Sequence, residues 1–314
     1  MKKITNLKEF ACTPDRFLGG HRLCPGCAHS MIVREVVNAT DDDLVVSTAT
    51  GCLEVCSAIY PYTSWDVSWI HIGFENAAAA ISGAEAMHKA LKRKGKLYTD
   101  RPVKFVAFGG DGGTYDIGFQ ALSGATERGH DFLYVCLDNE GYMNTGGQRS
   151  SSTPIGAHTT TSPRGRVSYG EKQKKKDITM IMAAHGSPYV ATACPSYWKD
   201  LAVKAQKALE TEGPTFINAL SPCTTEWKFK PEETVRIGEL AVESCAFPLY
   251  EIENGTKLRI TYRPKKKIPV KEYLGAQGRF SHLFKKGNEW ILDLWQKQVD
   301  EYWDYLQRRE ECGV

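Results

Sequence analysis

The sequence has no long hydrophobic run and no marked excess of either charge. A helix that crosses a membrane needs about 20 apolar residues in a row, and no stretch of the chain comes near that length. Residues 1–6 lack the apolar core of a secretory signal. The 40 basic and 37 acidic residues leave a net charge of +3, too small to favour nucleic-acid binding. We therefore expect a soluble, cytoplasmic protein without a membrane or nucleic-acid partner.

The composition is that of an ordinary globular protein, with 42% hydrophobic and 25% charged residues. At 314 residues the chain is long enough to bury a large core. One large α/β domain with extensions and a pair of domains are both compatible with this length. Two runs concentrate basic residues, 172–176 and 263–267, and we expect them to be solvated loops.

A glycine-rich turn, Gly110-Asp111-Gly112-Gly113, carries a single carboxylate. The apolar run before it, at residues 103–108, predicts a buried strand, and a helical segment follows at residues 117–128. Glycines let the main chain approach an anion closely, and free N–H groups at a helix start favour a phosphate. Because a bound diphosphate usually brings Mg²⁺, which prefers oxygen ligands, Asp111 is a candidate metal ligand.

A second polar residue is expected beside this turn. Residues 132–137 read as another buried strand, and Asn139 lies just beyond it. Between Gly112 and Asn139 there are 26 residues, the length of one helix and one strand. If the two strands are parallel neighbours, Asp111 and Asn139 lie at the same edge of the sheet, where open α/β sheets bind ligands.

Ten cysteines are many for a reducing compartment, where a disulfide framework is not expected. Cys136 lies inside an apolar strand and is interpreted as part of the core. Cys24 and Cys27 form a Cys-x-x-Cys pair, and Cys52 follows a predicted strand at residues 44–49. These three thiols are candidate ligands for zinc or for an iron–sulfur cluster, and spacing alone does not decide between them.

A fourth thiolate is needed for either kind of site. Cys194 and Cys223 each follow a predicted strand, at residues 189–193 and 215–220, and each has a proline beside it. The residues themselves leave these two candidates tied.

The glycine turn and Asn139 together resemble the thiamine-diphosphate motif of a known family of enzymes. The usual motif ends in two asparagines, whereas this chain has Asp138-Asn139, a variant. The resemblance implies that thiamine diphosphate binds at the turn. It also implies that Mg²⁺ is held by Asp111, Asn139 and the backbone carbonyl of Gly141.

The cysteines resemble the proximal four-iron four-sulfur ligands of the 2-oxoacid:ferredoxin oxidoreductases, which belong to the thiamine-binding beta subunit. This resemblance selects Cys223, in Ser221-Pro-Cys223, as the partner of Cys24, Cys27 and Cys52. It extends over roughly residues 15–285, and the beta subunits of the pyruvate and oxalate enzymes are the nearest types. The blocks that carry it are residues 69–80, 110–118, 138–154, 176–186 and 273–282.

The family also implies roles for single residues. Asn144 is expected to face the thiazolium and the substrate, Thr145 to lie beside the diphosphate, and Cys52 to lie near enough to couple cluster and cofactor. His71 and Glu75 are equally compatible with local structural roles, since Glu75 and the residue after it precede a predicted helix that they would cap. For the substrate carboxylate, the candidates on this chain are Arg149 and Arg164.

The reaction implied is the oxidative decarboxylation of a small 2-oxoacid, pyruvate or oxalate, with electrons passed to ferredoxin and coenzyme A used if pyruvate is the substrate. The chain has no eight-cysteine ferredoxin pattern, and the family places the glutamate that activates the thiamine aminopyrimidine on another chain. We therefore expect partner subunits, including one with that glutamate and a ferredoxin-like chain with several clusters. Two other interpretations are a non-redox thiamine decarboxylase with a structural zinc site and a non-enzymatic four-cysteine metal-binding scaffold.

The expected fold is the α/β thiamine-diphosphate-binding fold, a mostly parallel sheet flanked by helices, with a C-terminal extension. We expect an α/β domain at residues 1–230 that binds cofactor and cluster, and an extension at 231–314 that ends in an amphipathic helix. Residues 150–169, rich in Ser, Thr, Pro and Gly, predict a long surface loop. The remaining predicted elements are helices at 30–38, 76–94, 196–211 and 290–306 and short strands at 249–253 and 257–262.

Overall fold

A computed structural model describes residues 4, 6–97 and 99–313. The expectation for residues 1–6 therefore lies largely outside the described residues. One sheet organises the chain, in the order β2-β1-β3-β4-β6-β5-β7-β8. The first six strands in this order run parallel. Strand β7 pairs antiparallel with β5, and β8 pairs antiparallel with β7. The strands are β1 (Asp43–Ala49), β2 (Ser68–Ile72), β3 (Val103–Gly110), β4 (Phe132–Asp138), β5 (Tyr189–Ala193), β6 (Pro214–Leu220), β7 (Tyr250–Glu253) and β8 (Lys257–Ile260).

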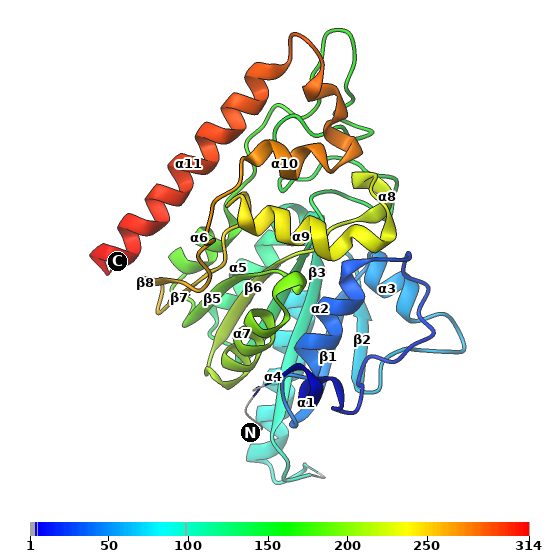
Figure 1. The fold of residues 1–314 in the computed structure, drawn as a ribbon. Coiled ribbons are helices and arrows are strands. Elements are labelled where there is room, and N and C mark those ends of the chain that lie inside the picture. Colours follow the sequence, from blue (N-terminus) through cyan, green and yellow to red (C-terminus); the bar gives the residue numbers. More distant parts are fainter. Residues whose placement is uncertain (1–3, 5, 98, 314) are drawn as a thin grey trace.

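Helices cover both faces of this sheet, with α2 and α7 on one face and α4, α5 and α6 on the other (Figure 1). The α-helices are α1 (Leu7–Ala11), α2 (Ala28–Val37), α3 (Cys52–Ser57), α4 (Ala77–Arg93), α5 (Phe119–Glu127), α6 (Ile178–Ala184), α7 (Trp198–Glu210), α8 (Thr224–Trp227), α9 (Thr234–Glu243), α10 (Val270–Gly275) and α11 (Glu289–Cys312). A π-helical turn, η1 (Gly112–Ile117), and the 3₁₀ turns η2 (Pro195–Tyr197), η3 (Pro231–Glu233) and η4 (Gly278–Phe284) complete the elements. The predicted α/β class with a mostly parallel sheet is confirmed.

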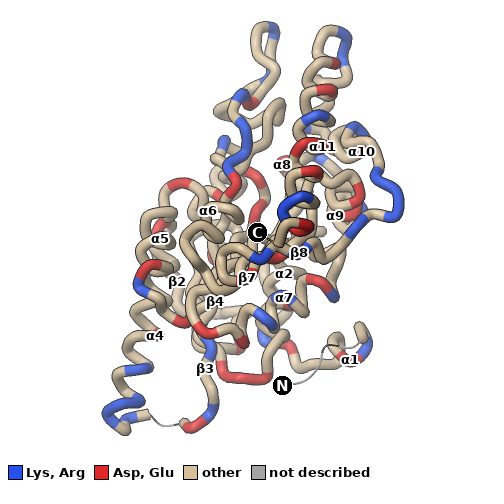
Figure 2. Tube along the Cα trace, turned by 90° about the vertical axis from the view of Figure 1, so that its left-hand side faces the viewer, with Lys and Arg blue, Asp and Glu red and all other residues tan. Residues whose placement is uncertain are grey.

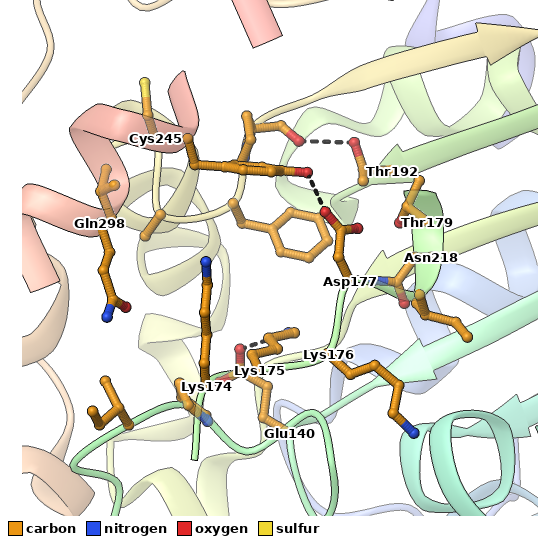
Figure 3. Close-up of a pocket in the computed structure, with 18 of the residues that line it drawn as sticks. Glu140, Lys174, Lys175, Lys176, Asp177, Thr179, Thr192, Asn218, Cys245 and Gln298 are labelled. Atoms are coloured by element: carbon orange, nitrogen blue, oxygen red, sulfur yellow. Dashed lines mark hydrogen bonds and ion pairs between the residues drawn. The ribbon is translucent and has the colours of Figure 1, made fainter. Parts of the chain in front are cut away.

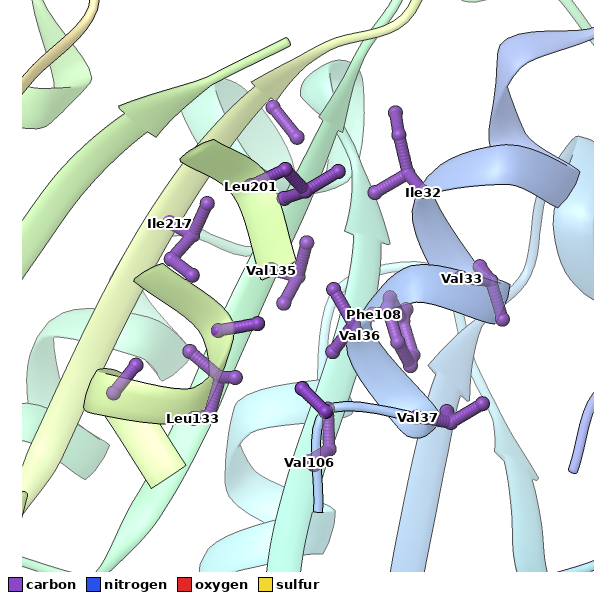
Figure 4. Close-up of a cluster of buried hydrophobic side chains, with 14 of the residues drawn as sticks. Ile32, Val33, Val36, Val37, Val106, Phe108, Leu133, Val135, Leu201 and Ile217 are labelled. Carbon is purple, nitrogen blue, oxygen red and sulfur yellow. The ribbon is translucent and has the colours of Figure 1, made fainter. Parts of the chain in front are cut away.

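Alternation along the strands divides the core into two layers. In β4, which is buried along its whole length, Leu133 and Val135 pack with α2 and α7, while Phe132 and Tyr134 pack toward α4 and α5. Figure 4 shows the first of these layers, where Ile32 and Val36 of α2 lie against the sheet. Strands buried on both faces read as continuous apolar runs, which is why β3, β4 and β6 were predictable. Cys136 is fully buried, as its apolar neighbours predicted.

A segment expected at the surface is instead half inside the protein. Within residues 150–169, side chains up to Thr159 are mostly buried, and only the second half is exposed. The prediction of a surface loop was wrong for this first half because its hydroxyl groups bond to buried carboxylates, as described below. The basic run at residues 172–176 was likewise not solvated throughout, since the Lys175 side chain is only 24% exposed.

The C-terminal part of the chain joins the same sheet. Strand β7 pairs with β5, and β8 pairs with β7. Helix α11 packs on β8 and α10 through Ile291, Val299 and Leu306. The division at residue 230 stays a prediction, and strands from both sides of it share one sheet. Acidic and basic residues are interspersed over the fold (Figure 2), and no helix among the described residues has the length and apolarity to span a membrane.

Candidate cofactor and cysteine site

Four neighbouring parallel strands deliver the expected site residues to one edge of the sheet. Gly110 at the end of β3 lies opposite Leu137 of β4, and Asp138 at the end of β4 lies opposite Leu220 of β6. The residues that follow these ends therefore emerge side by side, Asp111 after β3, Asn139 after β4 and Cys223 after β6. Strand β1, beside β3, leads into α3, whose first residue is Cys52. Figure 1 shows α3, α8 and α9 gathered at this end of the sheet.

The glycine turn after β3 is wider than an ordinary helix start. Residues 112–117 form a π-helical turn before α5 begins, a feature that often marks functional sites. A Cβ at Gly112 would fall within the Tyr142 ring, and one at Gly113 would lie 2.9 Å from the Phe74 carbonyl oxygen. At Gly110, in contrast, a Cβ would meet nothing. The turn thus packs tightly at two glycines and leaves space at the third.

A cavity of about 200 Å³ lies over this turn. Most of the predicted cofactor and catalytic residues line it, whereas Asp111 and Gly113 lie just behind its wall. Asn144 and Thr145 are exposed at its mouth. Its predicted lining residues are Cys52, Gly110, Gly112, Asn139, Gly141, Asn144 and Thr145, and its apolar side chains are Leu53, Phe74, Phe108, Leu137 and Met143.

Three oxygen-bearing groups converge at the cavity wall. One end of the Asn139 side-chain amide lies 2.8 Å from Asp111 Oδ1 and 2.8 Å from the Gly141 carbonyl oxygen. With its NH₂ at this end the amide donates to both oxygens, and with its Oδ1 there three oxygens face one another. Asp111 is fully buried and also accepts a hydrogen bond from Ser150 Oγ at 2.5 Å. Burial, together with the nearby Asp138 carboxylate, raises the pKa of Asp111 well above its ordinary value.

The variant residue Asp138 turns away from this group. Its carboxylate accepts hydrogen bonds from Tyr115 Oη at 2.8 Å, Ser152 Oγ at 2.5 Å and Lys175 Nζ at 2.7 Å. Burial works against the charge of Lys175, but the carboxylates of Asp138 and Glu140 raise the pKa of its ammonium group. The carboxylate at position 138 is thus satisfied by the partly buried Lys175 and by two hydroxyl groups.

Glu140 joins the same network from the other side of Asn139. It adopts a left-handed backbone conformation with φ of 64°. Its carboxylate accepts hydrogen bonds from Lys175 Nζ at 2.9 Å and from the buried Arg279 at 2.5 Å. Figure 3 shows Lys175 and Glu140 paired at the wall of a second cavity, of about 190 Å³, which lies between α11 and the segment that precedes α6.

Ser150 and Ser152 are functional candidates that sequence reasoning did not single out. Each is fully buried and donates to a different carboxylate of the strand ends, Ser150 to Asp111 and Ser152 to Asp138. Their signal in the sequence was the serine run at residues 150–152, separated by two residues from the segment at residues 144–147 that ends in two glycines. His29 was also missed; it lines the cavity, and burial lowers its pKa to about 4, so its ring is neutral.

The four predicted cysteines influence one another electrostatically. Burial, together with the neighbouring thiols of Cys223 and Cys24, raises the pKa of Cys27 to about 12. Burial and the same set of thiols, led by Cys27, raise the pKa of Cys52 to about 12. The set therefore gathers residues from the loop before α2, from α3 and from the loop after β6. Cys56, one turn along α3 from Cys52, is a fifth thiol at its edge.

Cys194 and Cys223, the two candidates for the fourth thiolate, lie in different surroundings. Cys194 is fully buried in an apolar cluster against Gly238 and lies outside the set. Cys223 is partly accessible. Burial raises the pKa of its thiol, and the Cys24 thiol adds to this rise. All ten cysteines are free thiols, and no three or more His, Cys, Asp or Glu side chains among the described residues are placed to hold a single metal ion.

The remaining candidates, His71, Glu75, Arg149 and Arg164, are not among the residues that line the cavity. Exposed His71 pairs with Glu54, with Nδ1 and Oε1 3.2 Å apart. Asn76 occupies the N-cap position of α4, but its side chain makes no capping bond. Arg149 pairs with Glu171 at 3.2 Å, and Arg164 donates to Ser281 Oγ at 2.5 Å. Neither arginine is among the residues that line the cavity.

Comparison with known proteins places this site in a family. Residues 49–219 match the model of the thiamine pyrophosphate enzyme C-terminal TPP-binding domain. The pyruvate synthase subunit PorB of Methanocaldococcus jannaschii is 58% identical over 285 residues, 91% of this chain and 94% of the relative. That of Thermotoga maritima is 49% identical over 314 residues, 98% and 97% of the two chains.

A second type of relative and a solved structure point the same way. The ketoisovalerate oxidoreductase subunit VorB of Pyrococcus furiosus is 41% identical over 95% of this chain and 97% of its own. A structure of 2-oxoglutarate:ferredoxin oxidoreductase from Magnetococcus marinus has a TM-score of 0.53 at 21% identity, over 85% of this chain and 90% of that one, and shares the fold. The chain thus belongs to the thiamine pyrophosphate enzymes and, within them, to the beta subunits of the 2-oxoacid:ferredoxin oxidoreductases.

Proposed function

We propose that this chain is the subunit of a pyruvate:ferredoxin oxidoreductase that binds thiamine diphosphate, Mg²⁺ and one four-iron four-sulfur cluster. One observation carries the proposal. Cys52 lines the same cavity as Asn139 and Gly141 and also belongs to the four-cysteine set. An oxidoreductase of this class needs its organic cofactor beside its first electron acceptor, and a residue common to both sites supports that arrangement.

The oxygens of Asp111, Asn139 and Gly141 fit a Mg²⁺ ion. Octahedral Mg–O bonds of 2.0–2.1 Å separate adjacent ligands by about 2.9 Å, close to the 2.8 Å separations around the Asn139 amide. The ion would also stabilise the charge of Asp111, which burial disfavours. Open space at Gly110, on the cavity wall, suits a diphosphate that approaches the main chain.

When bound, thiamine diphosphate supplies a carbanion that adds to the 2-oxo carbon and takes up the electron pair left by loss of CO₂. The chain's own residues bind and shield the reacting groups. We assign Thr145 to the diphosphate side of the mouth and Asn144 to the thiazolium and substrate. The apolar walls, including Phe74, Phe108 and Met143, exclude water from the space between them.

The cysteine set suits an iron–sulfur cluster better than zinc. A single ion binds all of its thiolates at once and needs them close together, whereas a four-iron cluster gives each thiolate its own iron. Besides burial, the thiols of Cys27, Cys223 and Cys24 all raise the pKa of Cys52, yet no three ligands among the described residues are placed for one ion. Cationic iron would also offset the repulsion between four thiolates.

Pyruvate fits the cavity better than oxalate. Oxalate carries a second carboxylate that calls for a cation, and no lysine or arginine of the described part of the chain lines the cavity. The methyl group of pyruvate matches its apolar walls. The relatives named pyruvate synthase support the same choice, and the ketoisovalerate oxidoreductase relative makes a branched 2-oxoacid the second candidate.

The subunit is proposed to act within a complex in the cytoplasm. Oxidation of pyruvate and coenzyme A to acetyl-coenzyme A and CO₂ releases two electrons, which ferredoxin accepts one at a time. The cavity mouth at Asn144 and Thr145 is open, which leaves room for a partner that supplies the aminopyrimidine glutamate. A ferredoxin-like partner would carry electrons away from the cluster.

Viologen reduction by the purified complex tests the proposal. Pyruvate, ketoisovalerate, oxalate and 2-oxoglutarate are each supplied with and without coenzyme A. We expect turnover with pyruvate that depends on coenzyme A and on Mg²⁺ with thiamine diphosphate. Oxalate turnover without coenzyme A would contradict the assignment of pyruvate. Zinc without acid-labile sulfide in the purified chain would support a non-redox decarboxylase instead.

A further inference from the structure

Helix α8, only four residues long, lies between the cysteine set and the thiamine motif. It begins directly after Cys223, and the Trp227 N–H closes its single turn on the Cys223 carbonyl at 3.0 Å. A helix this short contributes little stability of its own, so its position is fixed by what its side chains contact.

The first two side chains of α8 contact the Cys24–Cys27 loop. Thr224 Oγ1 donates to the Pro25 carbonyl at 3.2 Å. Thr225 Oγ1 lies 3.7 Å from Cys24 Sγ, as a donor to the sulfur. The N-terminal half of the helix thus binds the loop that carries two of the four cysteines.

The last two side chains contact the thiamine motif. Glu226 packs so closely on Gly147, in the segment that carries Thr145, that a Cβ there would meet its carboxylate. The Trp227 indole N–H donates to the Asn139 carbonyl at 2.8 Å, and the ring is fully buried. The Arg279 guanidinium stacks on this ring, 3.8 Å from its centroid, and pairs with Glu140.

We propose that α8 couples the two cofactors, so that filling the cysteine site tightens binding of Mg²⁺ and thiamine diphosphate, through the hydrogen bond from Trp227 to Asn139. The inference rests on the proposed function. A cluster bound to Cys223 fixes the start of α8, and the four-residue helix passes this constraint to the carbonyl of a metal-binding residue. By linkage, the bound diphosphate stabilises the cluster to the same extent. Trp227 is a positioning residue in this scheme and contacts neither reacting group.

The test measures the dissociation constant of Mg²⁺–thiamine diphosphate by calorimetry on the assembled complex, reconstituted with and without iron and sulfide. In the wild-type complex we expect cluster loading to tighten binding about fivefold or more, within the usual range of coupling between sites. Trp227→Phe keeps an aromatic ring under Arg279 but removes the N–H. It should bring the ratio of the dissociation constants without and with the cluster close to one.

Two further variants separate coupling from general damage. Thr224→Val removes the hydrogen bond from α8 to the Pro25 carbonyl and should also lower the ratio. Trp295→Phe removes another indole-to-carbonyl hydrogen bond, from Trp295 to Ile155 at 2.8 Å, far along the chain in α11, and should leave the ratio at its wild-type value. The inference, but not the proposed function, would be overturned by either of two results. One is that Trp227→Phe keeps the wild-type ratio of the two dissociation constants, and the other is that this ratio is one in the wild type. A loaded complex that binds no Mg²⁺–thiamine diphosphate would overturn the proposed function and the inference with it.

Discussion

Asp138, Asn139 and Glu140, at and after the end of β4, have three different roles. Asp138 is satisfied by Tyr115, Ser152 and Lys175, and Asn139 faces Asp111 and Gly141. Glu140 then reverses the backbone with its positive φ, at a cost of about 1–3 kcal/mol for a residue other than glycine. The hydrogen bonds from Lys175 and Arg279 hold it in that conformation. A network of charged side chains thus fixes the Asn139 amide, the proposed metal ligand.

At this scale, sequence reasoning predicted that Asp111 and Asn139 lie side by side and missed the residues that hydrogen-bond to the neighbouring carboxylates. Asp111 and Asn139 were predictable because glycine turns and strand ends mark them directly. Ser150, Ser152 and Arg279 were not, because a serine or arginine in a loop has the same pattern whether it is solvated or bonded to a buried carboxylate. Cys223 was separable from Cys194 only by resemblance, since both follow strands of the same sheet.

Asp111→Asn should separate metal binding from stability. The amide keeps an acceptor for Ser150 but removes a buried charge whose pKa burial raises. We expect the metal-free chain to be as stable as the wild type or more so in thermal unfolding. Calorimetry should find Mg²⁺–thiamine diphosphate bound at least about 100-fold more weakly, since even supporting residues of metal sites contribute 10–100-fold. Asp131→Asn, at the other end of β4, should bind normally, and unchanged affinity in Asp111→Asn would contradict the assigned ligand.

Cys223→Ser and Cys194→Ser test the choice of the fourth thiolate. Chemical analysis of the reconstituted full chain should give about four irons for the wild type and less than half of that for Cys223→Ser. Cys194→Ser should retain the iron, with some loss of thermal stability because the thiol is buried against Gly238. The reverse pattern would assign Cys194 to the cluster.

At the level of elements, the strands buried on both faces were predictable, as were the short strands β7 and β8, whereas β2 was not. Residues 189–193 form β5 as predicted, because a short apolar run between turns has few other structures open to it. Strand β2 is half exposed and carries no clear alternation. Residues 112–117 were expected to precede a helix from 117; instead the chain forms a π turn and α5 starts after Gly118, where a Cβ would clash with two backbone carbonyls.

Strand β7 depends on a buried carboxylate that should lose its charge in acid. Burial opposes the ionisation of Glu251, but hydrogen bonds from Lys207, Tyr189 and Arg259 lower its pKa to about 2, from 4.5. Because the folded pKa is depressed, this stabilisation is complete above pH 4.5 and is lost as the pH falls toward 2.

We expect Glu251→Gln to reduce the free energy of unfolding by about 2 kcal/mol near pH 7 and to flatten its decline between pH 4.5 and 2. Urea unfolding of the cofactor-free chain across this range measures both effects. Glu253→Gln, on the same strand but 34% exposed, should change stability by less than about 1 kcal/mol. Equal losses in the two variants would show that burial of Glu251 contributes nothing extra.

On the scale of the whole molecule, this chain supplies the residues at the base of the cavity, and the opposite side of the cavity is open. The proposed metal ligands, the glycine turn and the four cysteines all come from this chain, while Asn144 and Thr145 are exposed. The proposal that a partner chain completes the site rests on the family, since no pattern within one sequence identifies a residue that another chain supplies.

The isolated full chain should therefore bind Mg²⁺–thiamine diphosphate at least about tenfold more weakly than the complex, a difference of 1.4 kcal/mol. It should also reduce no viologen with pyruvate, and adding the partner chains should restore the activity. Calorimetry and the viologen assay check the two statements separately. Full turnover by the isolated chain would contradict the expectation that a partner chain covers the open side of the cavity.

The spread of the four cysteines, from residue 24 to residue 223, has a consequence for biosynthesis. At about 5–20 residues per second, a ribosome needs roughly 10 to 40 s to travel between the first and the last of them. Strand β6 is also made after β5 but lies between β5 and β4, so the sheet cannot close until Cys223 is almost in place. The proposed cluster can therefore be completed only after Cys223 has been made, and a nascent chain stalled before that point leaves Cys24, Cys27 and Cys52 without their fourth partner.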